Sequence, residues 1–222
     1  MSNITRTLIL QELHVNRMVI GVGVLAGVAS VAIAALGQLG FSIGSLIWLS
    51  TIIGMGVVLA LYGIMNERKE HSLEFIMSLP LSVGDYVRAK MIGLALCFLI
   101  TWALAVAAAL VLVFTKDSVP DGFAPYLVLL SVFMLANFCV VLCGTMFSVN
   151  EGMTTVVVVI TNMAVSIFMF IVGPMKGIHE FMWGPAPVWN PTFWAVLACE
   201  IVVGIFAFCL PLLVVARRRD FL

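Results

Sequence analysis

Hydrophobic residues dominate six long stretches of the chain, and polar or charged residues gather between them. The stretches span residues 18–37, 43–65, 91–114, 126–147, 153–173 and 192–216. The first five contain no Asp, Glu, Lys or Arg, and the sixth contains one, Glu200. A helix needs about 20 apolar residues to cross about 30 Å of hydrocarbon, whereas barrel strands are shorter. The pattern predicts an all-α integral membrane protein with six transmembrane helices in a single domain, residues 1–222.

Residues 1–17 show helical periodicity instead of a continuous apolar run. The apolar side chains that recur near helical spacing are Ile4, Leu8, Ile9 and Leu13. Polar residues, Glu12 among them, fall on the opposite face. An amphipathic helix of this kind lies in the membrane interface with its apolar face buried. We therefore expect an N-terminal interfacial helix before the first span.

Charge is concentrated in residues 66–90, between the second and third spans. The charged residues there are Glu67, Arg68, Lys69, Glu70, Glu74, Asp85, Arg88 and Lys90. From residue 67 to 79 the polar and apolar positions separate by face, which predicts an amphipathic helix. Pro80 ends that helix, because the residue before a proline avoids the helical conformation. Ser82 can cap a second helix that leads into the third span. A solvated loop that only orients the chain remains the alternative.

The stretch before the last span, residues 174–191, combines four prolines with the aromatic residues Phe181, Trp183 and Trp189. Tryptophan is enriched where the membrane meets water. We expect a re-entrant or interfacial segment here, on the outer side of the membrane.

Composition and charge support a membrane location. The chain is 63% hydrophobic and only 10% charged, whereas soluble domains carry about 25% charged residues. Its net charge of zero gives no reason to expect nucleic acid as a partner. Nine of the 11 Lys and Arg residues fall on the side of the two termini, and only Lys116 and Lys176 fall on the other. Since cytoplasmic loops carry the excess of Lys and Arg, we expect a multi-pass protein of the plasma (inner) membrane with both termini in the cytoplasm.

The chain offers little catalytic chemistry. It lacks a Walker-type phosphate-binding loop, and its three histidines lie far apart in sequence. We therefore expect no catalytic residue, no metal site and no cofactor in this chain. The five cysteines all fall within predicted spans, and Cys139 and Cys143 share one helix face. Packing and binding of a soft metal are both open for that pair.

Two further features lie inside the spans, and each has two interpretations. Gly23 and Gly27 have the small-xxx-small spacing that lets helices pack closely in a dimer, or they are ordinary glycines of a membrane helix. Glu200 lies within the last span, where a carboxylate is costly. It either ties that helix to its neighbours through a hydrogen bond or contacts a transported compound.

The sequence ERKEHSLEFIMSLPLSVGDYVRAKMIG, residues 67–93, resembles the first cytoplasmic loop of type 2 ABC transporter permeases, which have the ABCG-like exporter fold. The shared pattern falls on Glu67, Leu73, Glu74, Ile76, Met77, Pro80 and Lys90. The Gly-Thr pair usual before Leu-Glu is replaced by His71 and Ser72. The resemblance extends to the N-terminal helix, the six spans and the Asn190–Pro191 pair before the last span.

The resemblance implies that residues 67–80 form a coupling helix that docks on a separate cytoplasmic ABC ATPase, which binds ATP and Mg. The implied coupling residues are Glu67, Glu70, Leu73, Glu74, Ile76, Met77 and Pro80. The resemblance also implies a dimer with a second permease copy, identical or not, and a pathway along the interface lined mainly by spans 2 and 5. Asn162, Phe168 and Phe170 are the candidates on that pathway, with Glu200 as a further one.

The function implied by the resemblance is that of the membrane subunit of an ATP-driven exporter. It would move a hydrophobic or amphipathic cargo, such as a lipid, a peptide or a drug-like compound, by alternating access. Two alternatives stay open. One is a membrane assembly or immunity factor that uses the same fold without transporting. The other is a haem-exporter-like permease of cytochrome maturation.

Overall fold

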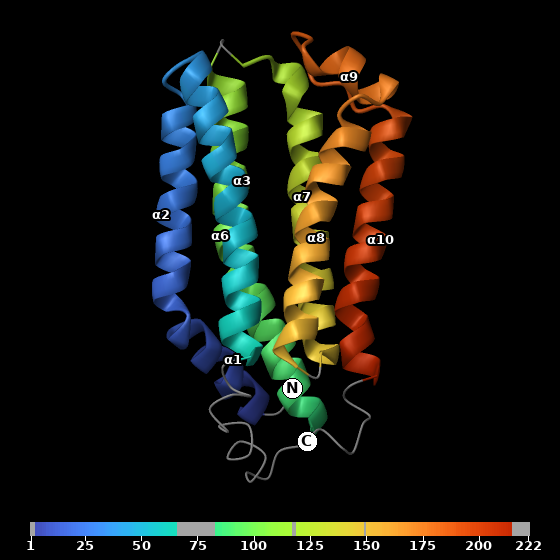
Figure 1. The fold of residues 1–222 in the computed structure, drawn as a ribbon. Coiled ribbons are helices and arrows are strands. Elements are labelled where there is room, and N and C mark those ends of the chain that lie inside the picture. Colours follow the sequence, from blue (N-terminus) through green and yellow to red (C-terminus); the bar gives the residue numbers. More distant parts are fainter. Residues whose placement is uncertain (1–2, 66–82, 117–118, 149, 215–222) are drawn as a thin grey trace.

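The computed structural model describes residues 3–65, 83–116, 119–148 and 150–214. The long helices within these residues are α2 (Arg17–Ala34), α3 (Gln38–Ala60), α6 (Val83–Thr115), α7 (Ala124–Phe147), α8 (Glu151–Val172) and α10 (Pro191–Val214). These six are long and apolar enough to cross a membrane, and they stand side by side in one bundle (Figure 1). The described residues contain no strand. The predicted all-α membrane protein with six transmembrane helices is confirmed.

Shorter elements lie at the ends of the bundle. They are α1 (Asn3–Val15), the π-helical turn η1 (Leu61–Met65), the 3₁₀ turn η2 (Asp121–Phe123) and α9 (Lys176–Met182). Figure 1 shows α1 at one end of the bundle and α9 at the opposite end. The coupling helix predicted for residues 67–79 and the cap at Ser82 lie outside the described residues.

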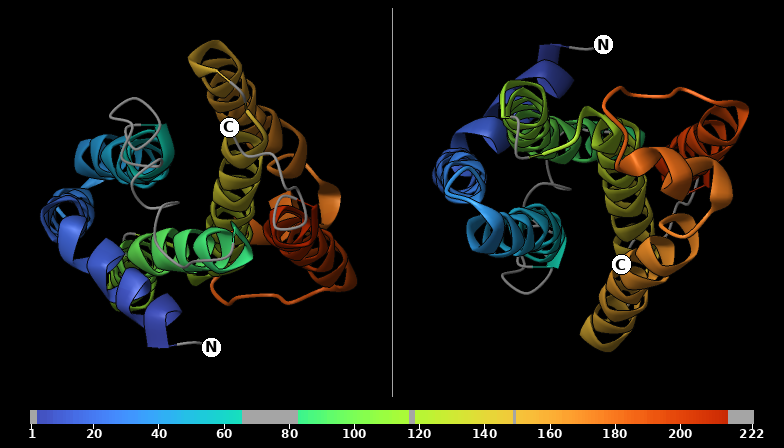
Figure 2. Two further views of the ribbon diagram at one scale, coloured as in Figure 1. Left: turned by 90° about the horizontal axis from the view of Figure 1, so that it is seen from below. Right: turned by 90° about the horizontal axis from the view of Figure 1, so that it is seen from above.

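Two groups of helices meet where α6 lies beside α7. Figure 2 shows α1, α2 and α3 on one side and α8 and α10 on the other. Two indole groups connect neighbouring helices inside the bundle. Trp48 Nε1 of α3 donates to the carbonyl of Ala105 in α6 at 3.1 Å, and Trp102 Nε1 of α6 donates to the carbonyl of Ser131 in α7 at 2.8 Å. Because no water is available inside a membrane to take their place, these bonds fix the positions of α3 and α7 relative to α6.

The first two spans form a close hairpin. The chain turns at Gly37, whose φ of 120° suits glycine, and α3 begins at Gln38 instead of at the expected residue 43. Gly44 then lies directly against α2, because an added Cβ would come within 2.5 Å of the carbonyl oxygen of Ser30. Gly40 and Gly44 repeat the small-xxx-small spacing of span 1, so close packing is also built into span 2.

Helix α6 is longer than a membrane span. Its 33 residues extend about 50 Å at about 1.5 Å per residue, which exceeds the hydrocarbon thickness of about 30 Å. Its first turns carry Lys90, only 3% exposed, whose Nζ lies 2.5 Å from Oε1 of Glu12 in α1. The predicted N-terminal helix is therefore present, and a nearly buried ion pair ties it to the start of the third span.

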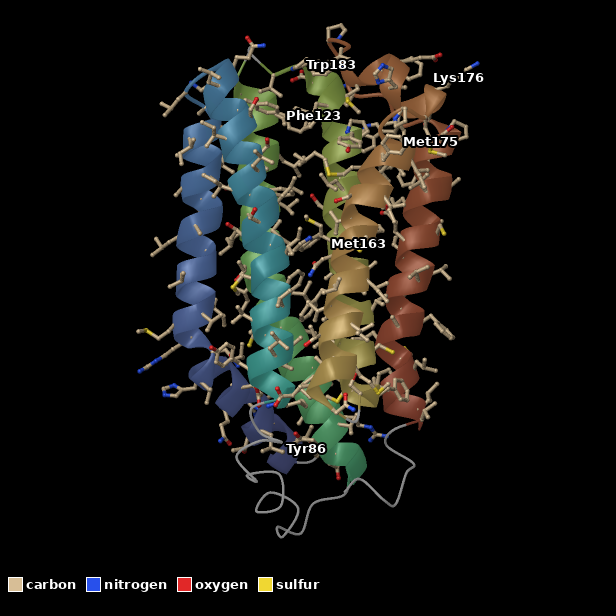
Figure 3. All side chains as sticks on the ribbon, viewed as in Figure 1. Tyr86, Phe123, Met163, Met175, Lys176 and Trp183 are labelled. Atoms are coloured by element: carbon tan, nitrogen blue, oxygen red, sulfur yellow. The ribbon has the colours of Figure 1, made fainter. Side chains whose placement is uncertain are left out.

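Helix α9 packs across the opposite end of the bundle, where Figure 3 labels Phe123, Lys176 and Trp183. Asn190 holds two helices together there. Its Oδ1 accepts from the backbone N–H of Phe193 at 2.9 Å and so caps α10, while its Nδ2 donates to the carbonyl of Gly177 in α9. The segment 174–191 thus contains a short helix fixed to the start of the last span.

Candidate functional site

Two hollows lie between α3 and α8, with α6 and α7 behind them. The larger, which we call the apolar cavity, has a volume of about 240 Å³ and is lined by α2, α3, α6, α7 and Met169 of α8. The smaller measures about 10 Å³, and we call it the asparagine hollow. Figure 2 shows α3 and α8 facing each other across this side of the bundle, with α6 and α7 at the back. The second and fifth spans therefore border the candidate site.

The asparagine hollow combines an apolar wall with two amide side chains. Its lining residues are Ile52, Ile53, Gly56, Val57, Phe98, Met134, Asn137, Phe138, Val141 and Asn162. Phe98 and Phe138 stack at its back, with ring centroids 4.0 Å apart. Met163, the neighbour of Asn162, lies at about the middle of the bundle's height (Figure 3). Polar residues at such depth usually face a cavity or the protein interior.

The two amides can bind the polar part of an amphipathic compound. An asparagine side chain offers two N–H donors and one acceptor oxygen, and the surrounding wall can contact an apolar part. Asn162 was predicted to lie on the cargo pathway and Asn137 was not, although both are uncharged polar residues within an apolar span. Their position in one hollow depends on how α7 packs against α8, which the sequence pattern does not reveal.

The three candidates on α8 take different positions. Asn162 lines the asparagine hollow. Phe168 is buried and stacks on Phe133 of α7, with ring centroids 4.1 Å apart. Phe170 is 83% exposed. Contact of Phe168 with cargo stays a prediction, and its packing against α7 argues against it, whereas Phe170 is free to contact lipid or a second copy.

Glu200 is buried within α10, and it does not line either hollow. Neither carboxyl oxygen has a hydrogen-bond partner within the described part of the chain. The hydrogen bond that would tie the last span to its neighbours is therefore not found there. A role in cargo contact stays a prediction, and a buried polar group without a partner costs about 1–3 kcal/mol.

Gly23 and Gly27 pack inside the chain. A Cβ on Gly23 would come within 2.6 Å of the sulfur of Met55 in α3, and one on Gly27 within 3.1 Å of the Cβ of Ala105 in α6. The close packing that their spacing predicts is thus used between α2 and its own neighbours. A contact of these glycines with a second copy stays a prediction, and their burial argues against it.

Cys139 and Cys143 lie one helical turn apart on α7. Cys139 and Cys143 are free and half-buried. No three His, Cys, Asp or Glu side chains gather anywhere in residues 3–65, 83–116, 119–148 and 150–214. Packing within α7 therefore stays the prediction for this pair, since buried thiols behave like small apolar groups.

Comparison with protein families identifies the kind of membrane protein. A family model described as ABC-2 family transporter protein matches residues 4–215. The chain belongs to this family. Neither a curated protein nor a solved structure matches the chain. The resemblance of residues 67–93 to type 2 ABC permeases is confirmed at the level of the family, and the chain is a permease subunit of an ABC transporter.

An ABC-2 permease generally works with a cytoplasmic ABC ATPase. The structure describes the helices that flank the predicted coupling helix, residues 67–80. The predicted coupling residues themselves lie outside the described residues: Glu67, Glu70, Leu73, Glu74, Ile76, Met77 and Pro80. On one flank α3 ends in the π-helical turn Leu61–Met65, and on the other α6 carries the Lys90–Glu12 pair. Glu12 lies 78 positions from Lys90, and no sequence signal marked it as the partner.

Proposed function

We propose that this ABC-2 permease is the membrane subunit of an ATP-driven exporter that moves a hydrophobic or amphipathic cargo by alternating access. ATP and Mg would bind on the partner ATPase. The cargo pathway would run between α3 and α8, where the amides of Asn137 and Asn162 offer hydrogen bonds within an otherwise apolar wall. The asparagine hollow is the observation that carries this proposal.

A second permease copy would complete the pathway. The asparagine hollow of one chain measures only about 10 Å³, roughly the space that one water molecule needs. Helix α8 also keeps a broad apolar face uncovered. Its exposed residues include Val156, Val159, Ile160, Met163, Ile167 and Phe170. A chamber large enough for a cargo requires α3 and α8 to separate or a second copy, identical or not, to form the facing wall.

The cytoplasmic ATPase would act on the coupling segment at the end of the bundle where α1 lies. Both ends of that segment continue into helices, because α3 runs into η1 before it and α6 begins at Val83 after it. Movement imposed there would pass directly to α3, which borders the asparagine hollow, and to α6, which forms its back. Alternating access follows if this movement changes the separation of α3 and α8.

The test is to purify the tagged permease from its own membranes, identify a co-purifying ABC ATPase by mass spectrometry, and reconstitute the complex in liposomes. ATP-dependent movement of a fluorescent phospholipid and of a hydrophobic dye is then measured. Asn162→Leu should reduce transport and cargo-stimulated ATP turnover without releasing the ATPase. The control is Ala107→Leu, at an exposed position of α6 that lines neither hollow, and it should leave transport unchanged. Absence of both a co-purifying ATPase and ATP-dependent movement would refute the proposal.

A further inference from the structure

We propose that the apolar cavity is a binding site for a hydrocarbon group, formed within a single permease chain. The cavity of about 240 Å³ lies on the α9 side of the asparagine hollow and is walled by residues from five spans. Its buried wall includes Trp48 of α3, Ala109 of α6 and Leu130 of α7. It therefore differs in position and in chemistry from the asparagine hollow, which carries the proposed pathway.

Three of the four polar side chains on the cavity wall donate hydrogen bonds to backbone carbonyls of the protein itself. Ser30 Oγ donates to the carbonyl of Gly27 at 2.7 Å, and Ser45 Oγ donates to the carbonyl of Ser42 at 3.0 Å. Trp48 Nε1 donates to Ala105, as described above. Tyr126 is the remaining wall residue with a polar side chain. A buried water needs two to four polar partners, so the cavity suits hydrocarbon and not water.

The size of the cavity matches a ring system or a segment of an acyl chain. An apolar cavity of about 150 Å³ stays dry and binds benzene. At about 240 Å³ the cavity of this permease is larger. In a membrane the surrounding medium is itself hydrocarbon, and a void of this size would forfeit the contacts of all its lining atoms. An acyl-chain segment or an apolar ring therefore stabilises the cavity when it binds.

Aromatic rings gather at the α9 end of the cavity wall. Phe123 packs against Phe41 and Tyr126 there, at centroid distances of 5.9 and 5.6 Å. The wall also includes Leu49 of α3 and Met169 of α8, which are half-buried and border the space between these two helices. An apolar occupant can therefore contact both aromatic rings and aliphatic side chains.

A hydrocarbon group can come from two sources. One is the acyl chain of a membrane lipid, which needs no transport activity. The other is the apolar part of the cargo, and this assignment alone rests on the proposed export function. The experiment separates the two by offering the hydrocarbon either attached to a phospholipid or as a free small compound.

The permease is reconstituted without ATP or ATPase in nanodiscs that contain a phosphatidylcholine with a diazirine at the end of its acyl chain. A parallel sample receives adamantyl diazirine, a free hydrocarbon probe. After illumination, labelled residues are mapped by mass spectrometry. Leu46 and Val111, which are more than 60% exposed, report contact with bulk hydrocarbon. We expect at least one probe also to label Trp48 and Leu130, which are 5% exposed each.

Cavity-filling variants make the result specific. Ala109→Phe places a ring in the cavity and should lower labelling of Trp48 and Leu130 several-fold, with Leu46 and Val111 unchanged. Ala107→Phe makes the same change on the exposed face of α6 and should leave the labelling of Trp48 and Leu130 unchanged. Ser45→Phe fills the cavity from α3, so the test still holds if Ala109→Phe does not fold.

Labelling by the phospholipid identifies a lipid chain as an occupant, and labelling by the free probe alone identifies a detached apolar compound. Failure of both probes to label Trp48 and Leu130 overturns the inference, as does labelling that persists in both filled variants. Because the measurement needs no transport, failure of the export proposal leaves the inference intact, and loss of labelling leaves the export proposal intact.

Discussion

Glu12 and Lys90 form an ion pair between α1 and α6 in which Lys90 is 3% and Glu12 15% exposed. The contribution of an ion pair to stability depends on how deeply it is buried. Exposed ion pairs contribute about 0–1 kcal/mol, whereas removing one partner of a buried pair costs about 3–5 kcal/mol because the other charge stays behind. The carbon atoms of Glu12 also lie close to Gly93, where a Cβ would meet them at 2.9 Å, so the side chain has little freedom to move.

We predict that Glu12→Gln lowers the free energy of unfolding by about 3 kcal/mol, the lower end of the range for buried pairs. The measurement is chemical or thermal denaturation of the purified permease in detergent. Gln11→Ala, at an exposed position on the same helix, is the control and should have little effect. Adding Lys90→Met to Glu12→Gln should restore part of the loss, since the buried charge of Lys90 is then removed as well. An effect of Glu12→Gln no larger than that of the control would contradict the prediction.

Glu200 gives a second prediction for a single residue. Its carboxyl oxygens are buried and have no hydrogen-bond partner among the described residues, so an apolar side chain of similar size should be tolerated. Glu200→Leu should leave the midpoint of thermal denaturation unchanged or raise it, with Cys199→Leu as the exposed control. A clear loss of stability would instead support the hydrogen-bond interpretation. Loss of transport in a stable Glu200→Gln variant would support contact with cargo.

Among the elements, the long helices were predictable from the sequence, and their contacts were not. Each apolar stretch produced one helix, because a span must satisfy its backbone hydrogen bonds internally. The spacing of Gly23 and Gly27 correctly indicated close packing, but the partners turned out to be α3 and α6 of the same chain. The spacing of small residues shows that another helix can approach closely. It does not identify that helix. Gly40 and Gly44 have the same spacing, and both pack against the backbone of α2.

The contact between η2 and α9 leads to a prediction for these elements. A Cβ on Gly122 would lie 2.1 Å from the carbonyl oxygen of Phe181 and 2.8 Å from that of Gly184. Both atoms belong to the backbone and cannot rotate away, so Gly122→Ala should displace α9 and cost about 1–3 kcal/mol through overpacking. The measurement is the rate of trypsin cleavage after the exposed Lys176, which should rise.

The matched control is Gly21→Ala, where no atom lies within 4 Å of the added Cβ. It adds a methyl group at an exposed position of a helix, where alanine is the better helix former. It should leave the cleavage rate unchanged. Equal rates for the two variants would show that α9 does not depend on its contact with η2.

The coupling helix expected in residues 67–79 gives a prediction that rests on the sequence. Buried apolar anchors at an interface are worth about 2 kcal/mol or more, and exposed ion pairs about 0–1 kcal/mol. Ile76→Asp should therefore release or uncouple the ATPase, whereas Glu70→Gln should have a mild effect. The measurements are co-purification of the ATPase and cargo-stimulated ATP turnover. If Ile76→Asp leaves both intact, the segment is a solvated loop and does not couple.

At the scale of the whole molecule, the sequence predicted the fold class, and the family comparison confirmed the kind of transporter. Its internal geometry could not be predicted in the same way. The asparagine hollow joins residues from α3, α6, α7 and α8, and the Glu12–Lys90 pair spans 78 positions. Such contacts depend on the rotation of each helix about its axis, and spans that are apolar on every side do not encode that rotation in their periodicity.

The orientation of the molecule in the membrane is the last prediction. Figure 1 places α1 and the last turn of α10 at one end of the bundle and α9 at the other. The distribution of Lys and Arg predicts that the α1 end faces the cytoplasm, because cytoplasmic segments carry the excess of these residues.

Gln11 of α1 and Lys176 of α9 are both exposed, so a cysteine at either position can react with a soluble reagent. In intact cells a membrane-impermeant maleimide should label Lys176→Cys and should reach Gln11→Cys only after permeabilisation. The unsubstituted chain, whose cysteines all lie within α6, α7 and α10, supplies the background. The reverse pattern of labelling would place the coupling segment outside the cell, out of reach of any cytoplasmic ATPase, and would refute the proposed mechanism together with the orientation.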